Sequence, residues 1–295
     1  MPANPLTRFL SRHPVLPADA AAAIERLEQL GAEQAELAAL AGTTSALLTA
    51  MYAWDPPLPE FSIDPEHAAT KHQAGIPLLR GESLILDAQV LRTQFIRLCE
   101  TMATHGNHGA VAQRDAARRQ HLDVHDVAME VIAGDPRAVA ERADRLGLDA
   151  GLAATLVRLT LFPLLARLQQ DHRALLDTST WRRGYCPFCG SWPLLGEYRG
   201  LETTRFLRCG LCASEWEVDR FLCPICDNRV HQDLINLVVE GEEARQRVVV
   251  CECCRSYVKQ VSTLVAIPAP QLLAVDVATL HLDLAAMERA YAPPQ

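Results

Sequence analysis

Four Cys-X-X-Cys pairs lie in the last third of this chain and constrain its fold more than any other feature. A Cys-X-X-Cys turn directs two thiolates toward one point, and two such turns complete a tetrahedral metal site. Nineteen residues separate the first two pairs, and twenty-four separate the last two. This spacing is typical of zinc-ribbon or rubredoxin-like units. We therefore expect two metal ions, iron or zinc, bound by Cys186 and Cys189, Cys209 and Cys212, Cys223 and Cys226, and Cys251 and Cys254.

The cysteine pairs also form an internal repeat. The strings CPFC and CGLCASEW in the first half correspond to CPIC and CECCRSYV in the second. A duplicated module explains this order and predicts that the first two pairs form one site and the last two pairs the other. Gly190 and Gly210 suit the turns because glycine tolerates a positive φ. Cys253 is left over, either as an incidental thiol beside the second site or as one poised to replace a neighbour.

Four thiolates suit zinc and iron alike. Zinc would be structural and redox-silent, whereas iron could exchange one electron and would absorb visible light in its ferric form. Because all four positions of either ion are filled by sulfur, no open position remains for hydrolytic chemistry. We expect no catalytic residues and no enzyme. Metal binding should also decide whether the cysteine segment folds. A small hydrophobic core supplies a net folding stability of only a few kcal/mol, whereas a structural four-thiolate site contributes on the order of 10 kcal/mol.

Composition limits the cellular location and the classes of binding partner that we expect. The chain has 295 residues, of which 49% are apolar, enough to bury a core and form two domains. The first residues, MPANPLTRFLSRHP, lack the apolar run of a signal peptide, and no stretch is expected to reach the length of a membrane span. A cytoplasmic location follows, and thiols there favour metal over disulfides. The net charge of -8, with eleven basic and eleven acidic residues in 182–259, argues against a nucleic-acid partner.

The region before the cysteines is expected to be helical. Apolar residues at three- and four-residue steps predict successive amphipathic helices over residues 17–180. Gly31 should end the first helix, and Asp149 should cap the longest, which runs to about Leu176 and is kinked or broken at Pro163. A proline-rich linker is expected over 55–65, and further helices over 84–102, 111–132, 136–146 and 268–291.

The character of the chain changes after Trp181. Short β-like runs next to the cysteines predict the hairpins of two ribbons, at residues 206–207, 234–239 and 248–250. The predicted fold class is therefore α+β. It comprises an N-terminal all-helical domain over residues 1–180, a first rubredoxin-like ribbon over 181–217, a second over 218–265, and a C-terminal helical segment over 266–295.

Other sites have less support in the sequence. Dithiol redox chemistry expects one Cys-X-X-Cys motif at a helix start near a βαβ pattern, which four motifs in ribbon order do not match. Cys99 is expected to be a core residue rather than a nucleophile using His105 or His108. His121 and His125 are four residues apart, but the string HLDVH lacks the Glu of the metalloprotease motif.

Three strings around the cysteines resemble the FdhE family of formate dehydrogenase accessory proteins. They are RGYCPFCGSWP at 183–193, LRCGLCASEWEVDRFLCPIC at 207–226 and CECCRSYVK at 251–259. The resemblance covers about residues 182–285, and further matching residues are Glu215, Trp216, Arg220, Tyr257 and Lys259. The chain departs from the family in AVDVATLHLD, which keeps Asp276 but has Val275 where an acid is usual.

The resemblance implies a cytoplasmic maturation factor with rubredoxin-like sites that can hold iron. Such a factor binds the catalytic subunit of a respiratory formate dehydrogenase before export and is needed for its assembly or activity. The ribbon faces, including Trp192, Trp216 and Tyr257, are a hypothetical docking surface. The other role open to these aromatic residues is to cover the metal sites, because small ribbons usually shield sulfur with aromatic side chains. The alternative function is that of a rubredoxin-like electron-transfer or thiol–disulfide redox protein.

Overall fold

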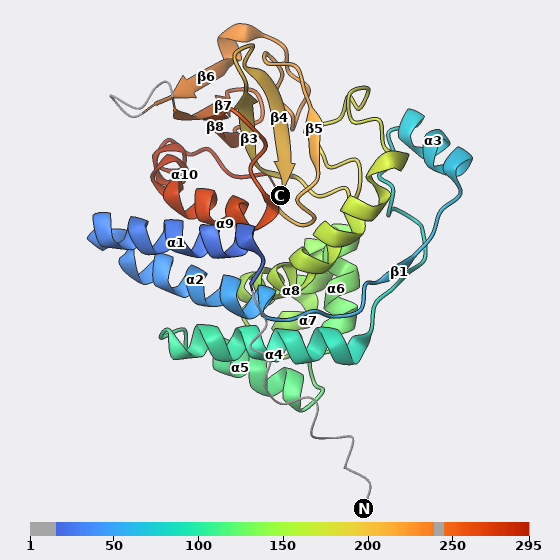
Figure 1. The fold of residues 1–295 in the computed structure, drawn as a ribbon, viewed down its shortest axis with the longest axis vertical. Coiled ribbons are helices and arrows are strands. Elements are labelled where there is room, and N and C mark those ends of the chain that lie inside the picture. The colour runs from blue at the N-terminus through green and yellow to red at the C-terminus, as the bar shows by residue number, and fades with distance from the viewer. Residues whose placement is uncertain (1–15, 239–244, 295) are drawn as a thin grey trace, which may run out of the picture.

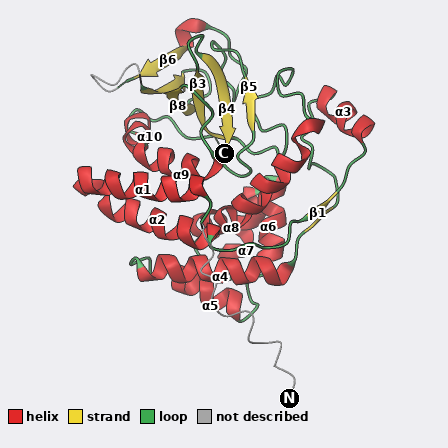
Figure 2. Ribbon diagram, in the orientation of Figure 1, coloured by secondary structure: helices red, strands yellow, loops and turns green. Residues whose placement is uncertain are grey.

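The structure, a computed structural model, describes residues 16–238 and 245–294. Most helices gather in one part of the molecule and the strands of the larger sheet in the other (Figure 1, Figure 2). The first fourteen residues, considered above for a signal peptide, and Val239, at the end of one expected strand, lie outside the described residues. The mixed helix and sheet architecture confirms the predicted fold class.

The helical part holds eight α-helices among the described residues. Aspartates cap several of them, and the Asp87, Asp123 and Asp149 side chains accept N–H groups of the first turns. Proline occupies the first helical position of two others, where its missing N–H costs nothing. The helices are α1 (Ala18–Glu33), α2 (Ala38–Tyr52), α3 (Pro65–Gln73), α4 (Ala88–Thr104), α5 (Gly109–Arg118), α6 (Val124–Ala133), α7 (Pro136–Arg145) and α8 (Ala150–His172).

Three helix boundaries differ from the sequence-based expectation. Helix α1 does not end at Gly31 but continues to Glu33. A Cβ atom at position 31 would lie 3.3 Å from the Ala38 Cα atom, so the glycine permits close packing of α1 against α2. Residues 84–85 form strand β2 (Leu84–Ile85), which pairs with β1 (Glu60–Phe61) inside the expected linker. The single helix expected over 111–132 is divided between α5 and α6 by a turn that includes Gln120 at φ 57°.

Helix α8 is the centre of the helical part and packs against α2, α4, α5, α6 and α7. It runs through Pro163 without a break, and Leu156, Leu161 and Leu165 are fully buried along it. With the short turn that follows, it spans Ala150–Leu175, which is long and apolar enough to cross a membrane by length and composition. The expectation that no stretch reaches that length was therefore wrong. A core helix passes the same test, and 56% of its most apolar window is buried inside the protein.

The cysteine region forms one six-stranded sheet instead of two separate hairpins. Its order is β5-β4-β3-β8-β7-β6, and every pair is antiparallel except β3 with β8. The first ribbon contributes β3 to β5 and the second β6 to β8, so the parallel pair joins the two halves. The strands are β3 (Pro193–Arg199), β4 (Thr204–Cys209), β5 (Glu215–Glu217), β6 (Leu234–Leu237), β7 (Gln246–Cys251) and β8 (Tyr257–Thr263).

Two glycines allow the ribbons to approach each other closely. Gly196 of β3 pairs with Gln260 of β8, and a Cβ atom on Gly196 would lie 2.2 Å from the Gln260 side-chain oxygen. A Cβ atom on Gly184 would lie 1.5 Å from the Pro224 carbonyl oxygen, which belongs to the third cysteine turn. The first ribbon therefore contacts the second through bare backbone at these points.

The C-terminal segment contacts both parts of the molecule. Helix α9 (Ala269–Ala278) packs against α1 and α2, while α10 (Leu280–Met287) packs against β6, β7 and β8 (Figure 1). Lys259 of β8 fastens both helices, since its ammonium group lies 2.6 Å from carboxylate oxygens of Asp276 and Asp283. The division of the chain at residues 180, 217 and 265 stays a prediction.

Candidate metal centres

The four cysteine turns share one backbone conformation. In each turn the N–H of the first cysteine donates to the carbonyl five residues later, at 2.9 Å, and the first cysteine's carbonyl accepts the N–H four residues later. The residue four positions after the first cysteine has a positive φ in every turn: Gly190, Ala213, Asp227 and Arg255. Gly190 behaves as expected, but Gly210 does not adopt a positive φ, because Ala213 holds that position in the second turn.

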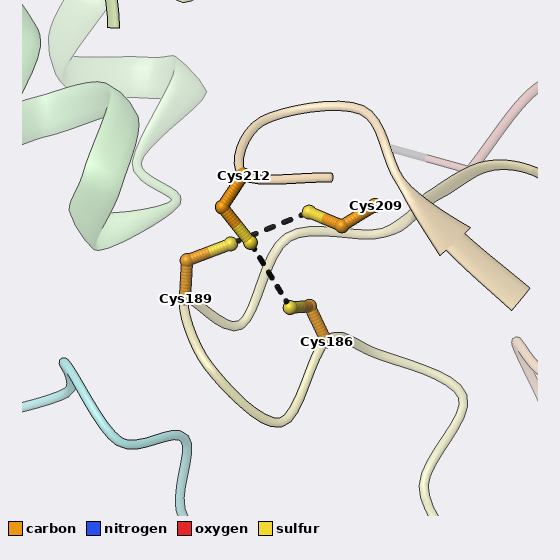
Figure 3. A group of neighbouring side chains, drawn as sticks. All are labelled: Cys186, Cys189, Cys209 and Cys212. Carbon is orange, nitrogen blue, oxygen red and sulfur yellow. Dashed lines mark hydrogen bonds between the residues drawn. The ribbon is translucent and has the colours of Figure 1, made fainter. Parts of the chain in front are cut away.

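These turns bring the eight sulfurs into two groups of four, in the expected order. In each group the four Sγ atoms lie within 4.8 Å of one another. Cys186 and Cys212 are 3.5 Å apart and Cys189 and Cys209 3.4 Å apart (Figure 3). In the second group the corresponding separations are 3.6 Å for Cys223 with Cys254 and 3.7 Å for Cys226 with Cys251. We refer to the two groups as the first and second clusters.

The sulfur separations fit a four-thiolate metal site. A disulfide would place two sulfurs about 2.05 Å apart, and all ten cysteines are free. Sulfurs bound tetrahedrally at the usual distance of about 2.3 Å from zinc lie roughly 3.8 Å from one another, close to the separations seen in both clusters. The clusters can therefore hold metal ions, and the donor set does not discriminate between iron and zinc.

Hydrogen bonds within the clusters favour a thiolate on one member of each. Burial alone would raise the pKa of Cys209, but neighbouring thiols and the Leu211 N–H, 3.3 Å from its sulfur, hold that pKa well below the ordinary value. The pKa of Cys251 is also lowered, because the N–H groups of Cys253 and Cys254 outweigh the effect of burial. Thiolates are the form in which cysteine binds metal.

The first cluster is enclosed by the protein. All four of its cysteines are buried. The segment before β2 covers the first turn, since the N–H groups of Leu78 and Leu79 donate to the carbonyls of Pro187 and Phe188 at 2.8 and 2.9 Å. Phe188 is itself fully buried. The helical part and the first cluster are thus connected by backbone hydrogen bonds as well as by packing.

The second cluster is partly open to solvent. Cys226 is exposed and Cys254 partly exposed, while Cys223 and Cys251 are buried. Cys253 is exposed and lies outside the group of four, as an incidental thiol would. Reagents that must touch sulfur therefore have direct access to the second cluster alone.

This difference in access predicts an order of metal loss. A chelator should remove metal from the second cluster first, and subsequent iodoacetamide should modify Cys226 and Cys254 well before Cys186 and Cys189, as followed by peptide mass spectrometry. Exposed Cys253 is the positive control and buried Cys99 the negative control. Simultaneous modification of both clusters would contradict the prediction.

Two of the three aromatic residues considered for docking are buried, which favours the shielding role. Trp216 is fully buried and donates its indole N–H to the Arg183 carbonyl at 3.0 Å. Tyr257 is 4% exposed and donates its hydroxyl to Asp283. Both side chains therefore stabilise the interior next to the clusters, in keeping with the alternative shielding role. Trp192 is partly exposed and packs edge-on against Tyr185.

Trp192 lines a cavity of about 610 Å³ between the first ribbon, the helical part and the C-terminal segment. Its walls also carry the Lys259 ion pairs, Asp135 and two arginines, Arg80 and Arg158. Arg80 donates to the Ala133 carbonyl, and Arg158 lies 3.4 Å from the Ser191 hydroxyl beside the first cysteine turn. Neither arginine forms an ion pair within residues 16–238 and 245–294. The cavity has the size of a ligand-binding pocket, a feature that sequence periodicity does not reveal.

The structure gives the remaining candidate residues ordinary roles. Cys99 is buried in the core of the helical part, and burial raises its pKa to about 12, so it is not a poised nucleophile. His121 precedes helix α6, whereas His125 lies within it, so the two do not share a helical face. Asp123, between them, caps α6 by accepting the N–H groups of His125 and Asp126.

The fold and the clusters define a class of protein in which a group of helices carries a pair of joined four-cysteine ribbons. A protein-family model described as "FdhE, central domain" matches residues 185–220. A relative in Pseudomonas aeruginosa, "Protein FdhE homolog", is 36% identical over 127 residues, 41% of this chain and 40% of the relative. Another in Aquifex aeolicus with the same name is 28% identical over 152 residues, 49% of this chain and 52% of the relative.

The solved structure of the FdhE protein from Pseudomonas aeruginosa matches with a TM-score of 0.65 at 22% identity, and the match covers 96% of each chain. The chain is thus similar in sequence to FdhE proteins around its cysteine turns, and its fold is that of the solved FdhE structure. It spans about half the length, or less, of the curated relatives it matches by sequence.

Proposed function

We propose that the chain is a cytoplasmic accessory factor for a respiratory formate dehydrogenase. It binds the catalytic subunit and is needed for assembly or activity of that enzyme, with two four-thiolate metal sites that fasten its binding platform. The pairing of eight cysteine sulfurs into two clusters carries this proposal, together with the match of residues 185–220 to the FdhE central domain. The geometry fits metals that are closed to substrate, because four sulfurs fill a tetrahedral site.

Bound metals would stabilise the partner-binding surface by connecting cysteine turns of the six-stranded sheet. Each cluster connects two turns that are distant in sequence, so a bound ion would tie the Cys186 turn to the end of β4 in the first ribbon and the Cys223 turn to the end of β7 in the second. Structural sites of this kind couple metal binding to folding. The sheet and the helices that rest on it would then present one fixed surface to the partner.

We place partner contact at the 610 Å³ cavity. Arg80 and Arg158 have no acidic partner in the described part of the chain, and Trp192 supplies a partly exposed aromatic wall. Unpaired guanidinium groups favour carboxylates, which they bind through paired hydrogen bonds. The occupant proposed here is an acidic segment of the catalytic subunit.

Co-purification and genetics test the function. Tagged wild-type protein should retain formate dehydrogenase catalytic subunit, and a strain lacking the protein should lose formate dehydrogenase activity. Arg158→Glu should reduce the retained subunit about tenfold or more, since it reverses a charge at the cavity. Arg137→Glu, on an 89% exposed side chain of α7, is the matched control and should retain it. Full activity in the deletion strain would exclude the function. Retention by Arg158→Glu would exclude only the cavity.

One observation favours a second candidate, an electron-transfer protein. The exposed Cys226 sulfur would give an iron centre at the second cluster a short path to a redox partner. Visible absorbance of protein purified without oxygen separates the two candidates, since stoichiometric colourless zinc would exclude electron transfer.

A further inference from the structure

Arg205 is a buried cation with no acidic partner. It lies on strand β4 of the first ribbon and is 1% exposed. Its Nη1 group donates to the Leu222 carbonyl at 2.7 Å and to the Asp219 carbonyl at 3.3 Å. Its Nε and Nη2 groups have no hydrogen-bond partner, and no ion pair includes it among the described residues. A buried, unpaired guanidinium is costly to a fold and calls for a physical explanation.

Arg205 lies beside the second cluster. Arg205, Cys223 and Cys251 line one small cavity of about 10 Å³, close to the lower limit for a single water molecule. Water in so small a space cannot solvate a guanidinium as bulk solvent does. The carbonyl that Arg205 holds most closely, that of Leu222, directly precedes Cys223. The side chain therefore both positions the third cysteine turn and places a positive charge beside it.

A metal at the second cluster would supply the missing negative charge. A divalent ion with four thiolates carries a formal charge of about -2, and a ferric ion about -1. Positive charge in the surroundings stabilises such a centre, and the low dielectric of the interior strengthens the effect. We propose that Arg205 is the counter-charge of the second metal centre. This inference rests on the proposed function only in requiring that the second cluster bind metal.

This assignment links the two ribbons through one strand. Strand β4 begins at Thr204 and ends at Cys209, so it carries Arg205 near one end and a ligand of the first cluster at the other. The second centre is therefore incomplete without the first ribbon, although all four of its ligands belong to the second. Binding of metal at the second cluster should depend on the charge at position 205 while binding at the first does not.

Chelator competition on the full chain tests this directly. Zinc-loaded wild type, Arg205→Met, Arg205→Lys and Arg220→Met are titrated with a chromogenic chelator, and zinc content is determined by mass spectrometry. Cys226→Ser identifies the phase that belongs to the second cluster. Arg205→Met should lower the affinity of the second cluster for zinc about 10- to 100-fold, the usual effect of losing a supporting group around a metal site. Arg220→Met removes an exposed cation from the segment between β5 and the third cysteine turn and should leave both affinities unchanged.

Each outcome decides the proposal. Retention of zinc at the first cluster in Arg205→Met shows that the ribbon has folded, and Arg205→Lys should restore much of the lost affinity because it restores the charge. Equal affinities in wild type and Arg205→Met would overturn the proposal. So would an equal loss in Arg205→Lys and Arg205→Met, which would assign the effect to packing. Wild type that binds no metal at all would instead refute the metal sites themselves.

Discussion

Cys186→Ser should remove one equivalent of metal and lower the free energy of unfolding by several kcal/mol. Cys186 is fully buried and lies 3.5 Å from Cys212, so its loss breaks the first cluster where solvent cannot compensate. A structural four-thiolate site contributes on the order of 10 kcal/mol to folding, and a site with three sulfurs retains only part of that. Elemental analysis gives the stoichiometry, and urea unfolding followed by fluorescence of buried Trp181 and Trp216 gives the free energy.

Cys253→Ser is the matched control for this change. Cys253 is exposed and stands outside both clusters, so the same substitution there should alter the free energy of unfolding by less than about 0.5 kcal/mol. Metal content should stay at two equivalents. If Cys186→Ser kept both equivalents and the wild-type urea midpoint, the first cluster would not be a metal site.

Glu197→Leu should lower the free energy of unfolding by about 3–5 kcal/mol, the usual cost of removing one partner from a buried ion pair. Glu197 is completely buried on β3 and accepts hydrogen bonds from Arg208, Arg199, the Thr263 hydroxyl and the Ile267 N–H. Arg208 is only 4% exposed, so the substitution would leave its charge without a partner in the interior. Urea unfolding at constant metal saturation measures the loss.

Two further variants isolate the cause. Glu215 pairs with the same Arg199 but is 41% exposed, so Glu215→Ala should cost less than about 1 kcal/mol. Removing both charges in Glu197→Leu with Arg208→Leu should recover most of the loss, since buried pairs are replaced by apolar residues at little cost. Equal losses in the Glu197 and Glu215 variants would contradict the account of a buried pair.

The cysteine clusters could be predicted from the sequence because their information is local. Each Cys-X-X-Cys turn forms its own hydrogen bonds, and the repeat fixes which turns combine, so Cys186 and Cys223 fall in the groups expected of them. Helix caps are also local, and Asp149 begins α8 as predicted. That these sulfurs bind metal stays a prediction.

Long-range packing could not be predicted in this way. The pairing of β3 with β8 joins residues more than sixty positions apart, and its requirement for a bare backbone at Gly196 appears only when Gln260 is placed opposite. The prediction that Gly31 ends the first helix was wrong for the same reason. This glycine permits close contact between α1 and α2, which the local sequence does not reveal. The choice between docking and shielding for Trp216 also depends on a distant contact, because its indole N–H donates to the carbonyl of Arg183, 33 residues earlier in the chain.

The parallel pairing of β3 with β8 also protects the protein from unwanted association. Two independent ribbons would have four open sheet edges, whereas the joined sheet, as far as the described residues show it, has two, formed by the three-residue β5 and the four-residue β6. The seven-residue strands β3 and β8 cover each other's unpaired backbone groups. Long open edges recruit strands from other molecules. One ribbon expressed without the other would therefore expose a seven-residue edge strand, prone to aggregation, that the intact chain covers.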